Sequence, residues 1–321
     1  MKVVILDDYQ DAVRNLACFS KLDGHEVAVY NDTAKSIYSL AGRLKGAEAV
    51  VLIRERTPVT EALLERLPSL RLISQTARGV AHVDLEACTR RGVAVAANGG
   101  SPHSTAELTW GLIHSAARHI PRDVQALREG RWQTTIGRTL RGMTLGVYAY
   151  GKIGSRVAQV GRAFGMEVLA WGREGSAERA KADGFEMAPS REALFESADV
   201  LCLHLRLNAE TRGLITAADL ARMKTSALLV NTSRAGLIEE GALLAALRAG
   251  RPGAAAVDVY EEEPVLGGDN PLLQMDNVVC TPHLGYVSIE NYEDYFGGAF
   301  DRVNAFAERK PIDILNPEAL D

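Results

Sequence analysis

The sequence predicts an α/β protein that contains two doubly wound parallel sheets, and three observations lead to this fold class. Short β-branched runs alternate with amphipathic stretches, which is typical of a mostly parallel sheet with helices on both faces. The runs are apolar without interruption, as expected for strands buried on both sides. The alternation also restarts in the middle of the chain, so the second series would form a complete sheet by itself.

The strand candidates fall into two series separated by a helix and an arginine-rich stretch. Those of the first series cover residues 3–6, 26–30, 49–53, 70–74 and 93–97, with helix candidates such as TEALLERL between them. Those of the second series cover residues 144–150, 167–171, 200–205, 227–231, 253–259 and 277–282. Helices are expected over residues 105–119 and 289–307. In the latter, Phe296, Phe300, Val303 and Phe306 form an apolar stripe that would pack against a domain.

Length and composition indicate an ordinary soluble protein of two domains. The chain has 321 residues, of which 47% are apolar and 24% charged. Its net charge of −5 gives no reason to expect nucleic acid or an anionic membrane as a partner, and no apolar run approaches the ~20 residues of a membrane span. The N-terminus MKVVILDD lacks the features of a signal peptide. We therefore expect a cytoplasmic location.

The four cysteines, Cys18, Cys88, Cys202 and Cys280, are scattered along the chain without paired spacing. Small buried side chains in a reducing cytosol are the expected explanation. Neither disulfides nor a metal site is predicted.

A glycine turn follows the first strand of the second series. The fingerprint of a Rossmann-type dinucleotide site is G-x-G-x-x-G between a strand and a helix, and its positions are Ala149, Gly151 and Gly154 here. Gly151 would let the backbone approach a pyrophosphate at the helix N-terminus, and Gly154 would let the helix pack closely on the strand. Ala149 adds one methyl group, which is tolerable unless the position needs a positive φ. Glycines that serve packing alone are the alternative.

The turn predicts that a dinucleotide contacts Tyr150, Gly151, Lys152, Ile153 and Gly154. The end of the next strand bears on which dinucleotide this is.

In an NAD site, a carboxylate about 20 residues further on binds the ribose 2′-hydroxyl. Gly172 stands at that position here and Arg173 follows it. A guanidinium would bind a 2′-phosphate, so the sequence leans towards NADP. The alternatives are that Glu174 reaches the ribose of NAD or that Arg173 is simply solvated.

Three further stretches, each just after a strand candidate, carry polar residues. They are NTSRAG, DVYEEEP and TPHLG, over residues 231–236, 258–264 and 281–285. Ligands of doubly wound sheets bind outside the carboxyl ends of the strands, so Arg234, Glu263 and His283 would converge there. Taken singly, each residue also has a structural alternative. Arg234 is compatible with an ordinary surface arginine, Glu263 with one acid in a solvated run, and His283 with a histidine in a capped loop.

In these motifs the sequence resembles the D-isomer-specific 2-hydroxyacid dehydrogenase family. The glycine turn, N-x-x-R, D-V-x-x-x-E-P and P-H-x-G occur in that family's order and spacing, and the likeness covers essentially the whole chain. The resemblance implies that Arg234 binds the substrate, that Glu263 is the acidic partner and that His283 is the acid/base.

The chemistry of such an enzyme calls for these residue types. When a 2-oxo acid is reduced, negative charge develops on the carbonyl oxygen, and an imidazolium donates a proton there near neutral pH. A neighbouring carboxylate favours the imidazolium and orients the ring. The planar guanidinium of Arg234 can hold the carboxylate and carbonyl oxygens of the substrate.

The resemblance also implies a domain layout and further site residues. Residues 1–100 and 288–321 would form a flavodoxin-like substrate domain, residues 101–287 the dinucleotide-binding domain, and the active site would lie in the cleft between them. The partner would be a small 2-oxo or 2-hydroxy acid, and the family is commonly homodimeric. Expected substrate contacts are Arg54, Arg56, Gly79 and Val80, and further cofactor contacts are Arg206, Thr232 and Asp258. Arg54 and Arg56 would favour a dicarboxylate or phosphorylated substrate if they point inward, and a solvated loop is the alternative.

The chain departs from the family pattern at a few places. Ala149 and Ala235 stand where glycine is usual, and Gly172 stands where the ribose-binding acid is usual. Arg206 stands where many members have proline on the adenine side. These departures leave open whether the cofactor is NAD or NADP, but they do not touch Arg234, Glu263 or His283.

The sequence therefore predicts an oxidoreductase that transfers a hydride between NAD(P)H and a 2-oxo acid. The alternative is a dinucleotide-sensing, corepressor-like binding protein without turnover, because fold alone does not fix function. A formate dehydrogenase of the same superfamily fits less well, since that subgroup has glutamine where Glu263 stands.

Overall fold

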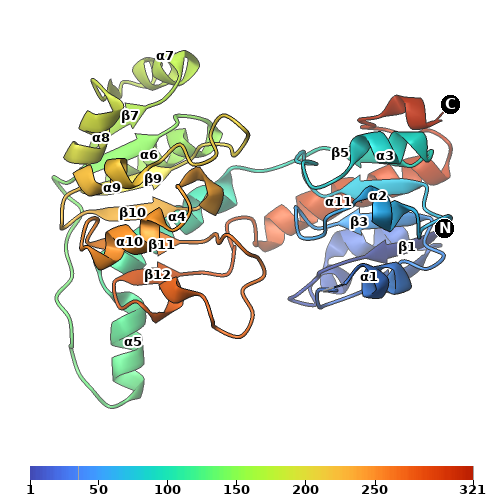
Figure 1. The fold of residues 1–321 in the computed structure, drawn as a ribbon, viewed down its shortest axis with the longest axis horizontal. Helices are drawn as coiled ribbons and strands as arrows, with labels where there is room; N and C mark the ends of the chain where they lie inside the picture. Colours follow the sequence, from blue (N-terminus) through green and yellow to red (C-terminus); the bar gives the residue numbers. More distant parts are fainter. Residues whose placement is uncertain (35, 321) are drawn as a thin grey trace. The chain divides into compact units, whose positions relative to one another are not determined.

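The computed structural model describes residues 1–34 and 36–320, which divide into two compact units (Figure 1). One unit comprises Met1–Ser101 and Val287–Asp321, and the other comprises Pro102–Tyr286. Asp321, the expected end of the substrate domain, lies outside the described residues. Among the described helices, none has the length and apolarity that a bilayer crossing requires.

The first unit is built on a five-stranded sheet of order β2-β1-β3-β4-β5, in which every pairing is parallel. Its strands are β1 (Lys2–Ile5), β2 (Glu26–Val29), β3 (Ala49–Leu52), β4 (Leu72–Gln75) and β5 (Ala94–Ala97). Its helices are α1 (Ile37–Arg43), α2 (Glu61–Leu64), α3 (Leu85–Arg90) and α11 (Ile289–Ala307), with the 3₁₀ turns η1 (Val13–Asn15), η2 (Ala17–Leu22) and η5 (Pro317–Leu320). This strand order is flavodoxin-like, in agreement with the fold that the resemblance implies for this domain.

The apolar runs form strands here because both of their faces are covered. All four residues of β3, β4 and β5 are buried, in keeping with helices on the two sides of the sheet. The C-terminal helix α11 begins after Ser288, whose side chain accepts a hydrogen bond from the Asn291 amide. Of its expected apolar stripe, Phe296, Phe300 and Val303 are buried, so packing against a domain is confirmed for this helix.

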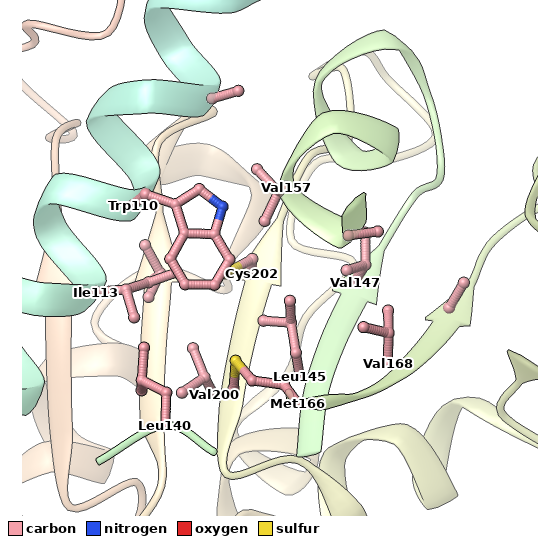
Figure 2. Close-up of a cluster of buried hydrophobic side chains, with 14 of the residues drawn as sticks. Trp110, Ile113, Leu140, Leu145, Val147, Val157, Met166, Val168, Val200 and Cys202 are labelled. Carbon is pink, nitrogen blue, oxygen red and sulfur yellow. The ribbon is translucent and has the colours of Figure 1, made fainter. Parts of the chain in front are cut away.

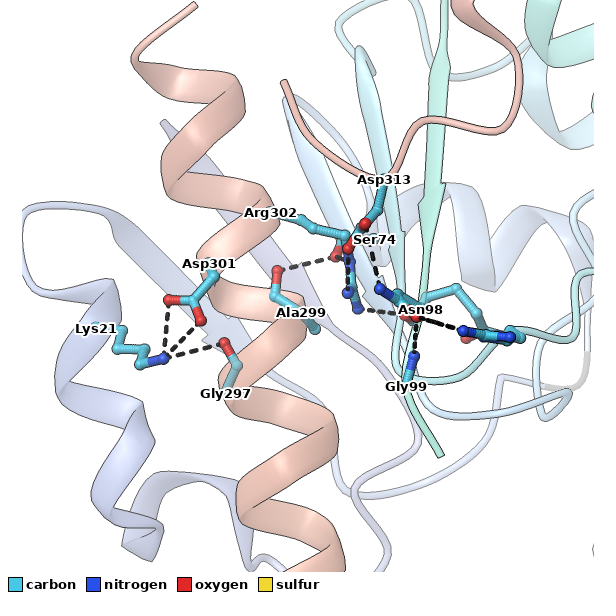
Figure 3. Close-up of polar contacts among 11 residues, drawn as sticks. Lys21, Ser74, Asn98, Gly99, Gly297, Ala299, Asp301, Arg302 and Asp313 are labelled. Atoms are coloured by element: carbon cyan, nitrogen blue, oxygen red, sulfur yellow. Dashed lines mark hydrogen bonds and ion pairs between the residues drawn. The ribbon is translucent and has the colours of Figure 1, made fainter. Parts of the chain in front are cut away.

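A buried arginine ties α11 to the sheet of the first unit (Figure 3). The Arg302 guanidinium donates to the Gln75 carbonyl at 2.7 Å and lies 3.4 Å from an Asp313 carboxylate oxygen. Asp313 in turn accepts from the Asn98 side chain at 3.2 Å. The network therefore joins the ends of β4 and β5 to the C-terminal segment.

The second unit is built on a seven-stranded parallel sheet of order β12-β11-β10-β9-β6-β7-β8. Its strands are β6 (Thr144–Tyr148), β7 (Glu167–Trp171), β8 (Glu186–Met187), β9 (Val200–Leu203), β10 (Leu228–Asn231), β11 (Ala254–Val257) and β12 (Val278–Cys280). Its helices are α4 (His103–Ala117), α5 (Ile120–Arg128), α6 (Lys152–Ala163), α7 (Glu174–Ala182), α8 (Arg191–Ser197), α9 (Ala217–Arg222) and α10 (Ala242–Arg248), with η3 (Ala235–Leu237) and η4 (Pro271–Gln274). The strand order reverses between β6 and β9, which is where doubly wound sheets bind their ligands.

Two details of the second unit differ from the sequence-based prediction. Strand β8 was not predicted, because a run of two residues carries no periodicity. Helix α4 begins two residues earlier than expected, after Pro102, and it ends at Ala117 because His119 takes a left-handed conformation with φ 51°. The fold class itself is confirmed for both units.

One core of the second unit lies between the sheet and the helices α4 and α6 (Figure 2), and a second cluster packs the sheet against α8, α9 and α10. Trp110 and Ile113 of α4 and Val157 of α6 pack on Leu145 and Val147 of β6. This packing places the N-terminus of α6 at the carboxyl end of β6, beside the switch point.

Candidate active site

The glycine turn connects β6 to α6 and begins with a strained residue. Ala149 has φ 75°, in the left-handed region that only glycine enters freely. This position therefore does take a positive φ, which is the case in which losing the glycine matters. The expectation that the methyl group of Ala149 is tolerable is wrong for the backbone. The turn nevertheless forms, with the Gly151 amide donating to the Ala149 carbonyl at 3.0 Å.

The two remaining glycines have different surroundings. A Cβ atom on Gly154 would lie 2.4 Å from the Ala149 carbonyl oxygen, so this position requires glycine for packing. A Cβ on Gly151 would meet nothing within 4 Å, and Gly151 begins α6 without any capping side chain. Open space in front of uncapped amides at a helix N-terminus suits a pyrophosphate group.

The residues flanking Gly151 differ in what they can offer a ligand. The Tyr150 side chain is fully buried and donates to Asp183 at 2.6 Å, while its carbonyl accepts from Arg179 at 3.1 Å. Only its backbone is left to face a dinucleotide. Lys152 is exposed, and Ile153 packs against the core.

The end of β7 explains why no acidic residue stands there. A Cβ on Gly172 would come within 2.9 Å of the Ser176 side chain and 3.4 Å of the Ala149 Cα, so an aspartate does not fit without a shift. Arg173, the next residue, forms an ion pair with Glu210 at 2.5 Å, and both side chains are exposed. Arg206 is exposed as well. The positive charge that favours a 2′-phosphate is therefore partly compensated by Glu210.

His204 is a candidate site residue that the sequence analysis did not single out. It follows β9 directly, at the switch point, and its amide donates to the Tyr148 carbonyl at 2.9 Å. Both of its ring nitrogens are buried without a hydrogen-bond partner among the described residues. Burial lowers the pKa of His204 to about 4, so the ring is neutral near pH 7. The sequence feature that could have identified His204 is its position at the end of an otherwise apolar strand candidate.

A buried polar ring without a partner normally indicates that a ligand or water completes its hydrogen bonds. Together with the open space at Gly151, His204 makes the switch point of this sheet fit a dinucleotide.

The central feature of the second unit is a contact between His283 and Glu263. The Nδ1 atom of His283 lies 2.5 Å from Glu263 Oε2, and the two side chains are 21% and 33% exposed. His283 has φ 54°, a left-handed conformation that is uncommon for a residue with a side chain. The Tyr286 ring stands edge-on to the imidazole with its centroid 5.4 Å away. The contact fixes the imidazole with Nδ1 on the carboxylate and leaves Nε2 for other chemistry.

The electrostatics of the pair favour an ionised Glu263. Burial raises the pKa of this carboxyl, but the hydrogen bond and charge of His283, the Tyr260 amide and the charge of Arg234 outweigh it, so the net pKa is lowered. Among these causes the charge of Arg234 has the smallest effect on the Glu263 pKa. Arg234 also donates to the Ser233 carbonyl at 2.7 Å, just before η3. The structure thus brings Glu263 and His283 into contact, and Arg234 belongs to the same unit, in the loop after β10.

Asp258 and Thr232, both expected to bind the cofactor, use their side chains inside the protein. Asp258 is fully buried and accepts from Thr281 Oγ1 at 2.6 Å, from the Leu284 amide at 2.7 Å and from the Gly285 amide at 2.8 Å. Burial raises its pKa despite these hydrogen bonds. The Thr232 hydroxyl lies 2.9 Å from that of Thr109 in α4. Asp258 therefore shapes the loop that carries His283.

The predicted substrate contacts of the first unit gather at the carboxyl ends of β3 and β4. The Arg54 guanidinium lies 5.8 Å from the Tyr295 ring centroid, and that of Arg56 lies 4.4 Å from the Tyr9 centroid. Arg56 also donates to the Asp7 carbonyl at 2.5 Å. Each guanidinium therefore lies near an aromatic ring at this end of the sheet.

The loop after β4 contains the other two predicted contacts. The Gly79 carbonyl accepts from the Gln75 side chain at 2.7 Å, and a Cβ on Gly79 would lie 2.9 Å from Glu55 Oε1. Val80 packs against the core of the first unit. Whether the amides of this loop bind a substrate stays a prediction.

Comparisons with known proteins identify the family. Residues 110–285 match the model of the D-isomer specific 2-hydroxyacid dehydrogenase NAD binding domain. The glyoxylate reductase of Aeropyrum pernix is 40% identical over 269 residues, which cover 80% of each chain. A crystal structure of a phosphoglycerate oxidoreductase from Vibrio cholerae is 51% identical with a TM-score of 0.93, over 96% of this chain and 99% of that one.

A further relative is longer than this protein. The D-3-phosphoglycerate dehydrogenase of Methanocaldococcus jannaschii is 38% identical over 289 residues, which are 89% of this chain and 53% of that one. The chain thus spans about half the length of that relative. With the family model matched over most of the second unit and relatives matched over most of the chain, the protein belongs to the D-isomer-specific 2-hydroxyacid dehydrogenase family.

Proposed function

We propose that this protein transfers a hydride between a nicotinamide dinucleotide and a small 2-oxo acid or D-2-hydroxy acid. The single observation that carries this proposal is the contact of His283 with Glu263 beside the charge of Arg234. A bound nicotinamide would supply or accept the hydride. The protein's part is to hold the substrate and to move a proton.

The proposed proton donor in the reducing direction is His283. With Nδ1 on the Glu263 carboxylate, a protonated ring carries its second N–H on Nε2, where it can reach a substrate oxygen. The lowered pKa of Glu263 keeps that carboxylate charged, and the charge stabilises the imidazolium. In the oxidising direction the neutral ring takes the hydroxyl proton at the same atom.

The proposed role of Arg234 is to bind the substrate. Its planar fork of donors matches the carboxylate and carbonyl oxygens of a 2-oxo acid, so it would fix the carbonyl in place and stabilise charge on the oxygen. We further propose that Arg54, Arg56, Gly79 and Val80 complete substrate recognition. The two arginines would favour a dicarboxylate or a phosphorylated acid, since paired guanidinium groups suit a second anionic group.

The proposed dinucleotide site consists of the turn 150–154, Arg173, Arg206, Thr232, Asp258 and His204. The amides at the start of α6 would hold the pyrophosphate, and the open space at Gly151 supports this. The cofactor is either NAD or NADP. The charge of Arg173 favours the 2′-phosphate of NADP. The ion pair of Arg173 with Glu210 compensates part of this charge, so a strong preference for NADP is not expected.

We propose that the protein is a homodimer, because α5 and the segment after it expose many apolar side chains. Trp132 is 76% exposed and Ile136 is 93% exposed, although Asp123 holds this segment through Thr134 and Thr135 at 2.5 Å each. Several exposed apolar side chains along one ordered segment are typical of a subunit interface. Sedimentation equilibrium tests this proposal, and Ile136→Glu should shift a dimer towards monomer.

A substrate panel tests the proposed activity. Glyoxylate, hydroxypyruvate, phosphorylated and branched 2-oxo acids are offered with NADH and with NADPH, and loss of absorbance at the nicotinamide band is followed. Turnover of at least one acid is expected. A protein that binds a dinucleotide but turns over no acid of the panel contradicts the proposal and favours the dinucleotide-sensing alternative.

A further inference from the structure

Tyr260 contacts both Glu263 and the backbone that leads to His283. It follows β11 by three positions, is 9% exposed, and belongs to an apolar cluster with Leu247 and Val257. Its ring packs in this cluster, whereas its amide and its hydroxyl form hydrogen bonds outside the cluster.

The backbone of Tyr260 contacts the acidic member of the pair. Its amide donates to Glu263 Oε1 at 2.9 Å, while the other carboxylate oxygen, Oε2, lies against His283. Both oxygens of Glu263 are therefore engaged, one by Tyr260 and one by the imidazole.

The hydroxyl of Tyr260 contacts the backbone that leads to His283. It donates to the Thr281 carbonyl at 3.0 Å, and the amide of His283 donates to the same carbonyl, also at 3.0 Å. One oxygen thus receives the Tyr260 hydroxyl and the His283 amide. Burial raises the pKa of the Tyr260 phenol, so the group remains a donor at any physiological pH.

The loop needs such support because His283 is held at φ 54°. A residue with a Cβ stays in this region only where the surroundings determine it. Asp258 accepts from the Leu284 and Gly285 amides and so holds the loop after His283. Before His283 the loop is held at Thr281, whose hydroxyl donates to Asp258 at 2.6 Å and whose carbonyl accepts from the Tyr260 hydroxyl at 3.0 Å.

We infer that Tyr260 is a positioning residue, which aligns the imidazole of His283 with the carboxylate of Glu263 through the Thr281 carbonyl. The inference rests on the proposed acid/base role of the pair. A purely structural tyrosine would fill the cluster with its ring alone, and Tyr260→Phe separates the two roles because it keeps the ring and removes the hydroxyl.

Tyr260→Phe should lower kcat for reduction of a 2-oxo acid about 10-fold, because a small misplacement of a reacting group slows the reaction strongly. The KM for the dinucleotide should stay within about 2-fold of the wild-type value. The alkaline limb of kcat/KM should move to lower pH, because an imidazole displaced from the Glu263 carboxylate is stabilised less in its protonated form. Tyr30→Phe is the matched control, since the Tyr30 hydroxyl also lies near a backbone carbonyl, that of Arg43 at 3.5 Å, in the other unit. It should move neither quantity.

A second readout needs no activity. A short hydrogen bond between Nδ1 and Oε2 gives a downfield ring N–H proton in the NMR spectrum, which His283→Asn identifies by its loss. Tyr260→Phe should move this signal upfield or broaden it, and both proteins are measured well below their unfolding temperatures.

Several outcomes overturn the inference. An unchanged ring N–H signal in folded Tyr260→Phe does so, and so does a fall in kcat without a change in the pH limb. If the wild-type protein reduces no acid but the signal still moves, the proposed function fails and the positioning role stands.

Discussion

His283 Nδ1 lies 2.5 Å from Glu263 Oε2, and the two residues reach this contact from neighbouring parallel strands. Glu263 follows β11 and His283 follows β12, so the sheet delivers both to its carboxyl edge. The charge of Arg234 acts on the same carboxylate.

Replacing Glu263 by glutamine tests the charge of the pair. Glu263→Gln keeps a side chain of the same shape but cannot stabilise an imidazolium, so turnover should fall about 10- to 100-fold and activity at alkaline pH should be lost first. Steady-state kinetics between pH 5 and 9 measure this. Glu262→Gln, at an exposed neighbouring acid, is the control and should behave as wild type. Equal losses in both variants would show that the effect is not specific to the pair.

The backbone of Ala149 predicts a stabilising substitution. Ala149→Gly removes the strain of a positive φ, which is worth ~1–2 kcal/mol, while added freedom of the unfolded chain offsets part of it. The free energy of unfolding should rise by about 0.5–1 kcal/mol in urea denaturation. Ala158→Gly, the same change inside helix α6, should lower it by about 1 kcal/mol or more. A loss of stability in Ala149→Gly would contradict the strain.

The buried ring of His204 predicts a dependence of stability on pH. Its pKa is about 4 in the folded protein, below the ordinary value of 6.5, so the unfolded chain binds the proton more tightly. The contribution to stability is therefore complete above pH 6.5 and is lost as the pH falls towards 4. Between pH 7.5 and 5 the free energy of unfolding should fall by about 2 kcal/mol from this group.

His204→Gln removes this titration. Its free energy of unfolding should fall less than that of wild type over the same pH interval, as measured by urea denaturation. If the free energy of unfolding depends on pH identically in the two proteins, the prediction is wrong. The His204 ring would then have a hydrogen-bond partner in solution. Saturating dinucleotide should also reduce the pH effect if the cofactor contacts the ring.

The ion pair of Arg173 and Glu210 predicts a change in cofactor preference. Glu210→Gln frees the guanidinium for a 2′-phosphate and removes a charge that repels it, so the Kd for NADPH should fall relative to that for NADH. The gain should be modest, about 3- to 10-fold, because the pair is exposed. Arg173→Gln should change the ratio in the opposite direction. Fluorescence titration gives both constants, and an unchanged ratio in both variants would exclude this arginine from phosphate recognition.

The sequence predicts most of the fold because many strands, such as β3, β4, β5, β9 and β10, are short runs that are buried on both faces. Strand β3, AVVL, is an example in which the composition alone indicates a buried strand. Strand β8 escapes prediction because two residues contribute too little pattern, and the end of α4 depends on a left-handed His119 that no periodicity reveals.

The candidate site can be predicted from the sequence only for residues that belong to a motif. Arg234, Glu263 and His283 stand in ordered motifs at strand ends, and parallel strands bring such ends together. His204 and Tyr260 stand out less, because their roles come from contacts that are made across the sheet, with Tyr148 and Thr281. The positive φ of Ala149 could not be predicted either, because an alanine in the motif does not reveal which backbone conformation it takes.

The most direct test of the account is the single-turnover rate of 2-oxo acid reduction in His283→Asn, with the dinucleotide Kd measured on the same protein. The account predicts that the rate constant falls by about 100- to 10,000-fold while the Kd stays within about 2-fold of wild type, since one acid/base group contributes that much and does not hold the cofactor. A variant that reduces the acid at the wild-type rate would contradict the role of His283 in proton transfer.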